Sequence, residues 1–538
     1  MLRPHRYFHA LALSAALAAC DAKSSHSSPI TDPGIGAIPP QALAQAGHAL
    51  RRIGFGPSPQ SLQDIGQQGV AWYVEQQLHP LLIDESALEP LATWTALLSL
   101  PQSEQDAALL AQLVERQFVR AIYSPRQLVE SMTLFWEGHF NTNYWTVFNW
   151  SLNGEARATW LETRENELFR AKALGRFEEL LRASATSPAM LITLDNVVNV
   201  AGNPNENYAR ELVELFTMGV DNGYTQHDIE ELARCFTGWG VCEVAPADVD
   251  DPLAACAPGS VGATLAFHFD ASRHDGGPKT IFAGTDHELA LPARSGNAGL
   301  DDGFDVLRHL SNLPETAGFL CKKLARKFVS DTPSPQLIQV CADVWVATSG
   351  DLTEVLRTLL TSADFMSEEN TWSKVETPFE SLCSVVRALD GRATREIELT
   401  NFRATLELKL HQSLFRWPEP DGFPELGDEQ LGTARMLGRI AFNQWIYLGQ
   451  GDDIHFDVAN LVAHHGAGDG SAANVVKALG KLLYQDNFAA ADEALALDFL
   501  ETDANHAPLP LDPHAGDYAQ RLKQVAAFIA SLPQGVEQ

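Results

Sequence analysis

The chain has 538 residues, of which 69 are Asp or Glu and 38 are Lys or Arg, so its formal net charge at pH 7 is −31. A surface this acidic repels phosphate backbones and anionic lipid headgroups, and we therefore expect no nucleic-acid partner. The apolar fraction of 45% is ordinary for a globular protein.

The first residues have the layout of a bacterial export signal. Arg3 and Arg6 form a positively charged segment, and the mostly apolar run over residues 8–19 is too short to cross a bilayer. The run ends in Leu-Ala-Ala-Cys at Cys20, which resembles the lipobox of bacterial lipoproteins, where the cysteine receives a diacylglycerol. Ordinary cleavage after the Ala-x-Ala site at 16–18 is the alternative. We expect residues 1–19 to be removed and the protein to be exported and lipid-anchored to a membrane, facing the periplasm or the cell exterior.

Composition divides the rest of the chain. Residues 20–40 are rich in Ser, Pro, Gly and Ala, which predicts a flexible tether. Helical periodicity dominates residues 41–240 and 301–538. Residues 241–300 are dense in Gly, Pro, Asp and Cys, which indicates an irregular region.

Two short strand-like runs, at 265–269 and 280–283, are expected within that irregular region. The predicted fold is therefore mainly α: a large multi-helical globular protein with one small β-hairpin near 265–283.

Six cysteines follow Cys20, an even number that permits up to three disulfides in an exported protein. A bond between Cys242 and Cys256 would close an otherwise irregular loop. Buried free thiols are the alternative for the others.

Two neighbouring segments are expected to be polar helices. The first, N-E-N-Y-A-R-E-L-V-E-L-F, starts at Asn205 and extends to about Met218, and the second begins with a capping box made by Thr225 and Asp228. Their short connection makes them neighbours in space. Each carries acids beside an arginine, a pattern that favours an ion-pair network on a helix face. A site where carboxylates bind a metal or act as acid and base is the alternative.

Three further features carry polar chemistry. The Gly-rich stretch F-H-F-D-A-S-R-H-D-G-G-P-K-T ends at Thr280, and Pro278 stands where a phosphate-binding loop needs glycine, so we exclude a nucleotide site. His139 lies on the apolar face of its helix, where a histidine is usually a core residue. A basic cluster over residues 322–327 indicates a solvated helix face.

Seven stretches in order resemble the bacterial family called domain of unknown function 1800, from about residue 45 to 530. They are R-R-I-G-F-G-P-S-P (51–59), L-F-W-E-G-H-F (134–140), the helix from Asn205, G-Y-T-Q-H-D-I-E-E-L-A-R-C-F-T-G-W (223–239), H-D-G-G-P-K-T (274–280), K-L-A-R-K-F-V-S-D (323–331) and W-P-E-P-D-G-F (417–423). The resemblance implies an exported bacterial protein of a family without an established activity. Members are often encoded beside a sulfatase-like exported family, which implies such a protein as a partner and an envelope polysaccharide setting.

The candidate catalytic residues all fall in these stretches: His139, Glu206, Arg210, Glu211, Asp228, His274, Asp275 and Lys279. We expect the two polar helices and the 274–280 loop to bring them to one polar centre. If the three cations Arg210, Arg234 and Lys279 neutralise the acids, the centre would be a structural lock, that is, an ion-pair network that stabilises the fold without taking part in a reaction. If acids outnumber the cations, a divalent metal, Ca²⁺ or Mg²⁺ ahead of zinc, would bind through oxygen ligands. The metal candidates are Glu211, Glu214, Asp228 and Glu231.

Two functions are compatible with this pattern. The first is a cell-envelope binding or assembly protein that docks a secreted partner. The alternative is a hydrolase or lyase that acts on an envelope glycan, with a divalent metal as its potential cofactor. Exposed aromatic patches without a pocket would favour docking, whereas a pocket lined by the polar motifs would favour catalysis.

The lipobox is tested by the substitution Cys20→Ser. Because this change removes the acylated thiol, we expect the protein to leave the membrane fraction or to remain unprocessed. Cell fractionation and intact-mass measurement report both effects. An unchanged distribution and mass would refute the lipoprotein prediction.

Overall fold

The computed structural model describes residues 34–91, 109–150, 154–259, 263–393, 399–449, 454–485 and 487–538. The expected signal segment, Cys20 and most of the expected tether lie outside these ranges. The last part of that tether is packed, because Ile35 in a 3₁₀ turn at Ile35–Ala37 is fully buried. Among the described helices, none combines the length and the apolar character needed to cross a membrane.

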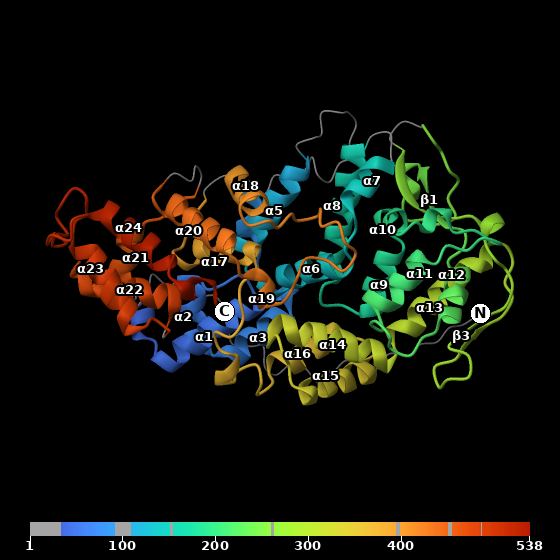
Figure 1. Cartoon of the computed structure of the whole chain (residues 1–538), viewed down its shortest axis with the longest axis horizontal. Coiled ribbons are helices and arrows are strands. Elements are labelled where there is room, and N and C mark those ends of the chain that lie inside the picture. The colour runs from blue at the N-terminus through green and yellow to red at the C-terminus, as the bar shows by residue number, and fades with distance from the viewer. Residues whose placement is uncertain are drawn as a thin grey trace, which may run out of the picture.

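The molecule is elongated and mainly α-helical, as the sequence predicts (Figure 1). The helices of its N-terminal half are α1 (Pro40–Ile53), α2 (Pro59–Gln68), α3 (Val70–Leu78), α5 (Leu109–Tyr123), α6 (Gln127–His139), α7 (Tyr144–Trp150), α8 (Gly154–Lys172), α9 (Phe177–Ala185) and α10 (Pro188–Thr193). The first helices, up to α6, lie near the centre, where helices of the C-terminal half pack against them, and α7, α9 and α10 lie towards the end that carries strand β1 (Trp239–Val244).

The expected polar helices are both present. The first is α11 (Asn207–Glu211), which continues as a π-helical turn over Leu212–Phe216. The second is α12 (Gln226–Cys235), and its capping box pairs Thr225 with Asp228 as the sequence predicts.

The irregular region contains four short strands in two antiparallel pairs. They are β1 (Trp239–Val244), β2 (Thr264–Phe269), β3 (Lys279–Ile281) and β4 (Leu289–Leu291). The two predicted strands are β2 and β3, but they do not form a hairpin with each other: β2 pairs with β1, and β3 pairs with β4. The segment between β2 and β3 includes a 3₁₀ turn at Ala271–Arg273 and the loop that bonds α12, so the two strands belong to separate sheets.

The C-terminal half is again helical. Its helices are α13 (Leu300–Ser311), α14 (Pro314–Phe328), α15 (Pro335–Thr348), α16 (Leu352–Leu360), α17 (Pro378–Ala388), α18 (Thr400–Leu408), α19 (Gly427–Gln430), α20 (Thr433–Tyr447), α21 (Val458–His464), α22 (Ala472–Tyr484), α23 (Ala490–Glu501) and α24 (Tyr518–Ala530). Several starts follow from local chemistry, since a Ser or Thr cap precedes proline at the first helical position in α2, α10, α15 and α17.

Aromatic side chains join the two halves in one core. Phe118 of α5 lies 4.5 Å, between ring centres, from Phe379 of α17. Phe177 of α9 lies 5.1 Å from Trp345 of α15. These contacts are buried, so helices that are more than 150 residues apart in sequence depend on each other for burial of apolar area.

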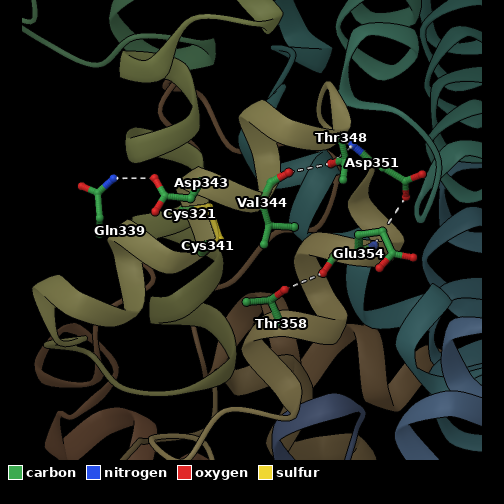
Figure 2. Close-up of a disulfide and its surroundings, with 9 residues drawn as sticks. All are labelled: Cys321, Gln339, Cys341, Asp343, Val344, Thr348, Asp351, Glu354 and Thr358. Atoms are coloured by element: carbon green, nitrogen blue, oxygen red, sulfur yellow. Dashed lines mark hydrogen bonds between the residues drawn. A yellow bond between two sulfur atoms is a disulfide. The ribbon is translucent and has the colours of Figure 1, made fainter.

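Two disulfides are present in the described chain. Cys242–Cys256 is the predicted bond and closes the loop between β1 and β2. Cys321 of α14 is bonded to Cys341 of α15 (Figure 2). Cys235 and Cys383 are buried free thiols.

The α14–α15 disulfide is expected to stabilise the fold measurably. It closes a loop of 20 residues, and a loop of this length corresponds to about 3 kcal/mol of stabilisation. The double variant Cys321→Ala, Cys341→Ala should lose about that much free energy of unfolding in urea titrations. Equal unfolding midpoints for variant and wild type would show that the bond adds nothing to stability.

Candidate functional site

The first group of predicted residues forms a ladder on the surface of α11. Arg210 bonds Glu206 at 3.0 Å and Glu214 at 3.5 Å. Gln226 of α12 donates to the same Glu206 oxygen at 2.8 Å. These side chains are between a quarter and two-fifths exposed, so the ion pairs add little stability. Glu211 beside them is half-buried, and its pKa is raised by burial and then by Glu214.

The second group is a buried ion-pair network around Asp302 of α13. Lys279 Nζ lies 2.6 Å from Asp302 Oδ2, and His274 Nε2 lies 3.2 Å from the same oxygen. Arg294 holds the other oxygen at 2.8 Å. The Asp302 side chain is fully buried. Burial alone would raise its pKa, but His274 and Lys279 hold it below its usual range.

The 274–280 loop does close over α12, as expected. Arg234 lies 2.6 Å from Glu231 and 2.8 Å from Asp275, and its hydrogen bond lowers the pKa of Asp275 to about 2. Glu231 and Asp228 accept the backbone N–H groups of Thr280 and Phe282. The candidate metal oxygens on α12 are thus engaged by a guanidinium and by backbone donors, an arrangement that corresponds to a structural lock.

Within the described chain, the two groups are not bonded to each other directly, although both contact α12. No hydrogen bond or ion pair between described residues joins the α11 ladder to His274, Asp275 or Lys279. The counter-ions that hold the second group include Asp302 and Arg294, neither of which the spacing of the motifs indicated.

His139 belongs to the core. It is buried against the rings of Trp136 and Phe140, and its Nε2 lies 3.2 Å from the carbonyl oxygen of Phe216. Burial and then nearby Lys323, whose Nζ lies 3.3 Å from His139 Nδ1, lower its pKa well below the usual value. The imidazole is therefore neutral at physiological pH and packs as a core side chain.

A pocket lies elsewhere, and three of the signature stretches form its walls. L-F-W-E-G-H-F supplies Phe135 and Glu137 from α6, K-L-A-R-K-F-V-S-D supplies Lys327 from α14, and W-P-E-P-D-G-F supplies Trp417 and Phe423. Glu162 of α8 and Glu380 of α17 complete its polar wall. The cavity measures about 140 Å³, similar to the cavity of roughly 150 Å³ that holds one benzene ring.

The 417–423 loop is fixed to the end of α6. Asn141 Nδ2 donates to the carbonyl oxygens of Trp417 at 3.0 Å and Glu419 at 2.7 Å. Gly422 has a φ of +80°, and a Cβ there would collide with the carbonyl oxygen of Gly138. Glycine is thus required at position 422 both for its backbone conformation and for the close approach of the two motifs.

Carboxyl groups on one side of the pocket are held in the neutral form. Burial, followed by the charges of neighbouring glutamates, raises the pKa of Glu137 and of Glu162 well above the usual range. Burial raises the pKa of the adjacent Glu165 to about 7. None of these three carboxyls forms an ion pair with a cation among the described residues. A buried carboxyl without a cation takes up a proton, which removes its negative charge.

The opposite side of the pocket is charged. Lys327 Nζ lies 2.5 Å from Glu380 Oε1, and Thr377 donates its backbone N–H to Glu380 Oε2 at 2.8 Å. Burial would raise the pKa of Glu380, but Lys327 lowers it below the usual value. Lys374, also in the pocket wall, bonds Asp331 at the end of the third motif. Lys327 of the basic cluster therefore bonds inside the pocket wall, so the prediction of a solvated face is wrong for this residue.

Sequence reasoning missed most of this pocket. Glu137 stands two residues before His139 in the same motif, but a lone glutamate in an apolar helix gives no periodic signal. Glu162 and Glu165 lie outside all the signature stretches. The available signal was the W-P-E-P-D-G-F stretch, because binding and catalytic residues lie disproportionately on loops.

The fold and the pocket define a large helical protein with one polar, aromatic-walled site. The family model described as "Protein of unknown function (DUF1800)" matches residues 48–533, and the chain belongs to this family. Comparison with curated proteins and with solved structures gives no match.

The buried carboxyls predict a specific pH dependence of stability. Between the ordinary glutamate pKa of 4.5 and the value of about 7 for Glu165, the folded state keeps a proton that the unfolded state has released. The free energy of unfolding therefore falls as pH rises through this range. Glu165→Gln removes the group, and the slope should become shallower by up to about 1.4 kcal/mol per pH unit.

Urea unfolding across this range measures the slope. The control is Glu75→Gln. Hydrogen bonding to Arg357 lowers the pKa of Glu75, so removing this group should change the pH dependence of stability in the opposite direction, and only at pH values below the ordinary glutamate pKa. If Glu165→Gln keeps the wild-type slope, Glu165 is not protonated in the folded protein.

Proposed function

We propose that this chain is a carbohydrate-acting hydrolase of the bacterial cell envelope, and that the pocket between α6, α8, α14 and α17 is its active site. One observation carries the proposal: neutral carboxyls and an ionised carboxylate face the same cavity. Two carboxyl groups whose environments move their pKa values apart are the arrangement that glycoside hydrolysis requires.

The assignment of roles follows from the protonation states. The Glu137–Glu162 pair holds at least one proton at neutral pH and serves as the general acid that protonates the leaving oxygen. Glu380, kept ionised by Lys327, stabilises the developing positive charge on the sugar or activates a water molecule.

The wall of the pocket supports a sugar as the substrate. Trp417 and Phe423 lie with ring centres 5.1 Å apart in the loop that covers the cavity. Aromatic faces attract the partly positive C–H groups of a pyranose ring. The amides of Asn141 and Gln412, also in the wall, match sugar hydroxyls. A net charge of −31 disfavours polyanionic chains, so we expect a neutral or amino sugar, and hydrolysis ahead of elimination.

Two features support an envelope setting. The signal-like segment ending at Cys20 predicts export. The Cys242–Cys256 and Cys321–Cys341 disulfides suit an oxidising compartment. A divalent metal is not needed for this proposal, since Lys327 and protons compensate the carboxyls of the pocket.

Docking of a secreted partner is the second candidate function. Leu81 and Leu82 are adjacent in sequence and 89% and 86% exposed, which is unusual for large apolar side chains. A sulfatase-like exported protein remains the partner that the family setting suggests. Such docking is compatible with an active site in the pocket.

The test is hydrolysis of envelope glycans by the purified protein. We expect new reducing ends from a neutral or amino-sugar polysaccharide, and a loss of about 100-fold or more in rate for Glu162→Gln and Glu137→Gln. Urea unfolding of each variant confirms that it is folded.

The matched control is Glu206→Gln, which changes a carboxylate of the α11 ladder and should keep the wild-type rate. Equal rates for Glu162→Gln, Glu137→Gln and wild type would exclude the pocket as the active site. Binding of a glycan without any new reducing ends would favour a binding protein.

A further inference from the structure

A second cavity lies on the other side of α8. It measures about 250 Å³ and is lined by Glu165 of α8, by α9 and by the loop that the Cys242–Cys256 disulfide closes. Glu162 and Glu165 are three residues apart on the same helix, yet Glu162 lines the first cavity and Glu165 lines the second. The helix thus places one carboxyl at each of two cavities.

A single hydroxyl connects the two carboxyls. Thr142 Oγ1 lies 3.4 Å from Glu162 Oε2 and 3.2 Å from Glu165 Oε2. All three side chains are at least nine-tenths buried, with exposed fractions of 4% for Thr142, 4% for Glu162 and 2% for Glu165. The other oxygen of Glu165, Oε1, is buried without a hydrogen bond of good geometry among the described residues. Burial raises the pKa of the Glu165 carboxyl, whereas the hydroxyl of Ser187, in the wall of the second cavity, interacts with this carboxyl and lowers its pKa by less. A buried oxygen without a well-formed hydrogen bond has room for a proton or for a water molecule from the cavity.

The proposed reaction creates a need for such a connection. The general acid loses its proton to the leaving group in each turnover and must regain one. A substrate that fills a cavity of about 140 Å³ also excludes water from it. A proton that arrives from behind the acid avoids this obstacle.

We propose that Glu165 and Thr142 form a proton path from the second cavity to Glu162, and that they reload the acid while the sugar-binding pocket is occupied. The role of this path in turnover rests on the proposed function. The hydrogen-bonded connection from Glu165 through Thr142 to Glu162 does not depend on it. Glu165 and Thr142 touch no substrate, so they are positioning residues.

The proton balance is simple. The Glu165 carboxylic acid gives its proton to Thr142 Oγ1, and Thr142 gives its own hydroxyl proton to the Glu162 carboxylate. Glu165 is left as a carboxylate and takes a proton from water in the second cavity. One proton moves in and none is created or lost.

Several charged groups surround the path. Glu137 of α6 raises the pKa of Glu162, as does Glu165. The second cavity is also lined by Arg164 of α8, which bonds Asp250 at 3.1 Å, and by Arg182 of α9, which stacks on Phe304 at 3.8 Å. On the pocket side the charged groups are Lys327, Lys374, Glu380 and Glu425. Of these cations, Arg164, Lys327 and Lys374 already bond other acids.

The first test needs no substrate. Infrared titration of the purified protein follows the protonated carboxyl band of Glu162, which is assigned by its loss in Glu162→Gln. Glu165→Gln removes a neighbouring negative charge and should lower the apparent pKa of Glu162 by about one unit. Thr142→Val removes a donor to the Glu162 carboxylate and should raise it, whereas Thr142→Ser should restore the wild-type value.

The second test uses turnover. Thr142→Val should lower kcat at least about tenfold with little change in KM, because reloading and not binding is impaired. Thr142→Ser should restore it, and a small diffusible acid such as formic acid should restore part of it. A merely structural threonine would show neither the split between kcat and KM nor the rescue.

The outcomes separate the two proposals. If the Glu162 titration is the same in wild type, Glu165→Gln and Thr142→Val, the path does not exist, whatever the activity. If Thr142→Val keeps full kcat, or if Thr142→Ser fails to rescue it, the path is also overturned. If the titrations are coupled as expected but wild type hydrolyses no glycan, the path stands and the hydrolase proposal fails.

Discussion

The burial of three glutamates between α6 and α8 is the constraint on which the site depends. An ionised carboxylate in a protein interior requires a cation or several hydrogen bonds, and otherwise it takes up a proton. Glu137, Glu162 and Glu165 have hydrogen bonds from Asn166 and Thr142 but no cation among the described residues. The protein therefore keeps a group of neutral acids inside a chain whose surface is strongly acidic.

Two polar centres show how the same residue types serve different ends. Around Asp302, the cations Lys279 and Arg294 and the imidazole of His274 converge on one carboxylate, and its pKa stays below the usual range. Removing Asp302 would leave the buried Lys279 without a carboxylate partner, so this centre fixes the 274–280 loop in place. The acids beside the pocket have the opposite balance, with more carboxyls than cations. A network that is fully paired has no proton to give, whereas a carboxyl without a cation can donate one.

The sequence was informative where local chemistry decides the structure. The mainly helical fold, the capping box at Thr225 and the Cys242–Cys256 bond all follow from patterns within about fifteen residues. The pairing of β2 with β1 was missed because no strand was predicted over Trp239–Val244. The pocket was missed because it joins Glu137 to Trp417 across nearly the whole chain, and one sequence carries no signal of contacts at that range.

Two of the signature stretches meet at the pocket through a glycine in each and through the asparagine that follows the first of them. Gly422 can approach Gly138 only because it has no Cβ, and Asn141 then bonds the backbone of the 417–423 loop. None of the three stretches 134–140, 323–331 and 417–423 is a catalytic signature by itself. Together they form a pocket in which the aromatic 417–423 loop covers Glu137 and Glu162. Polar motif residues such as His274 and Lys279 lie elsewhere, because they bind Asp302 and hold the 274–280 loop against α13.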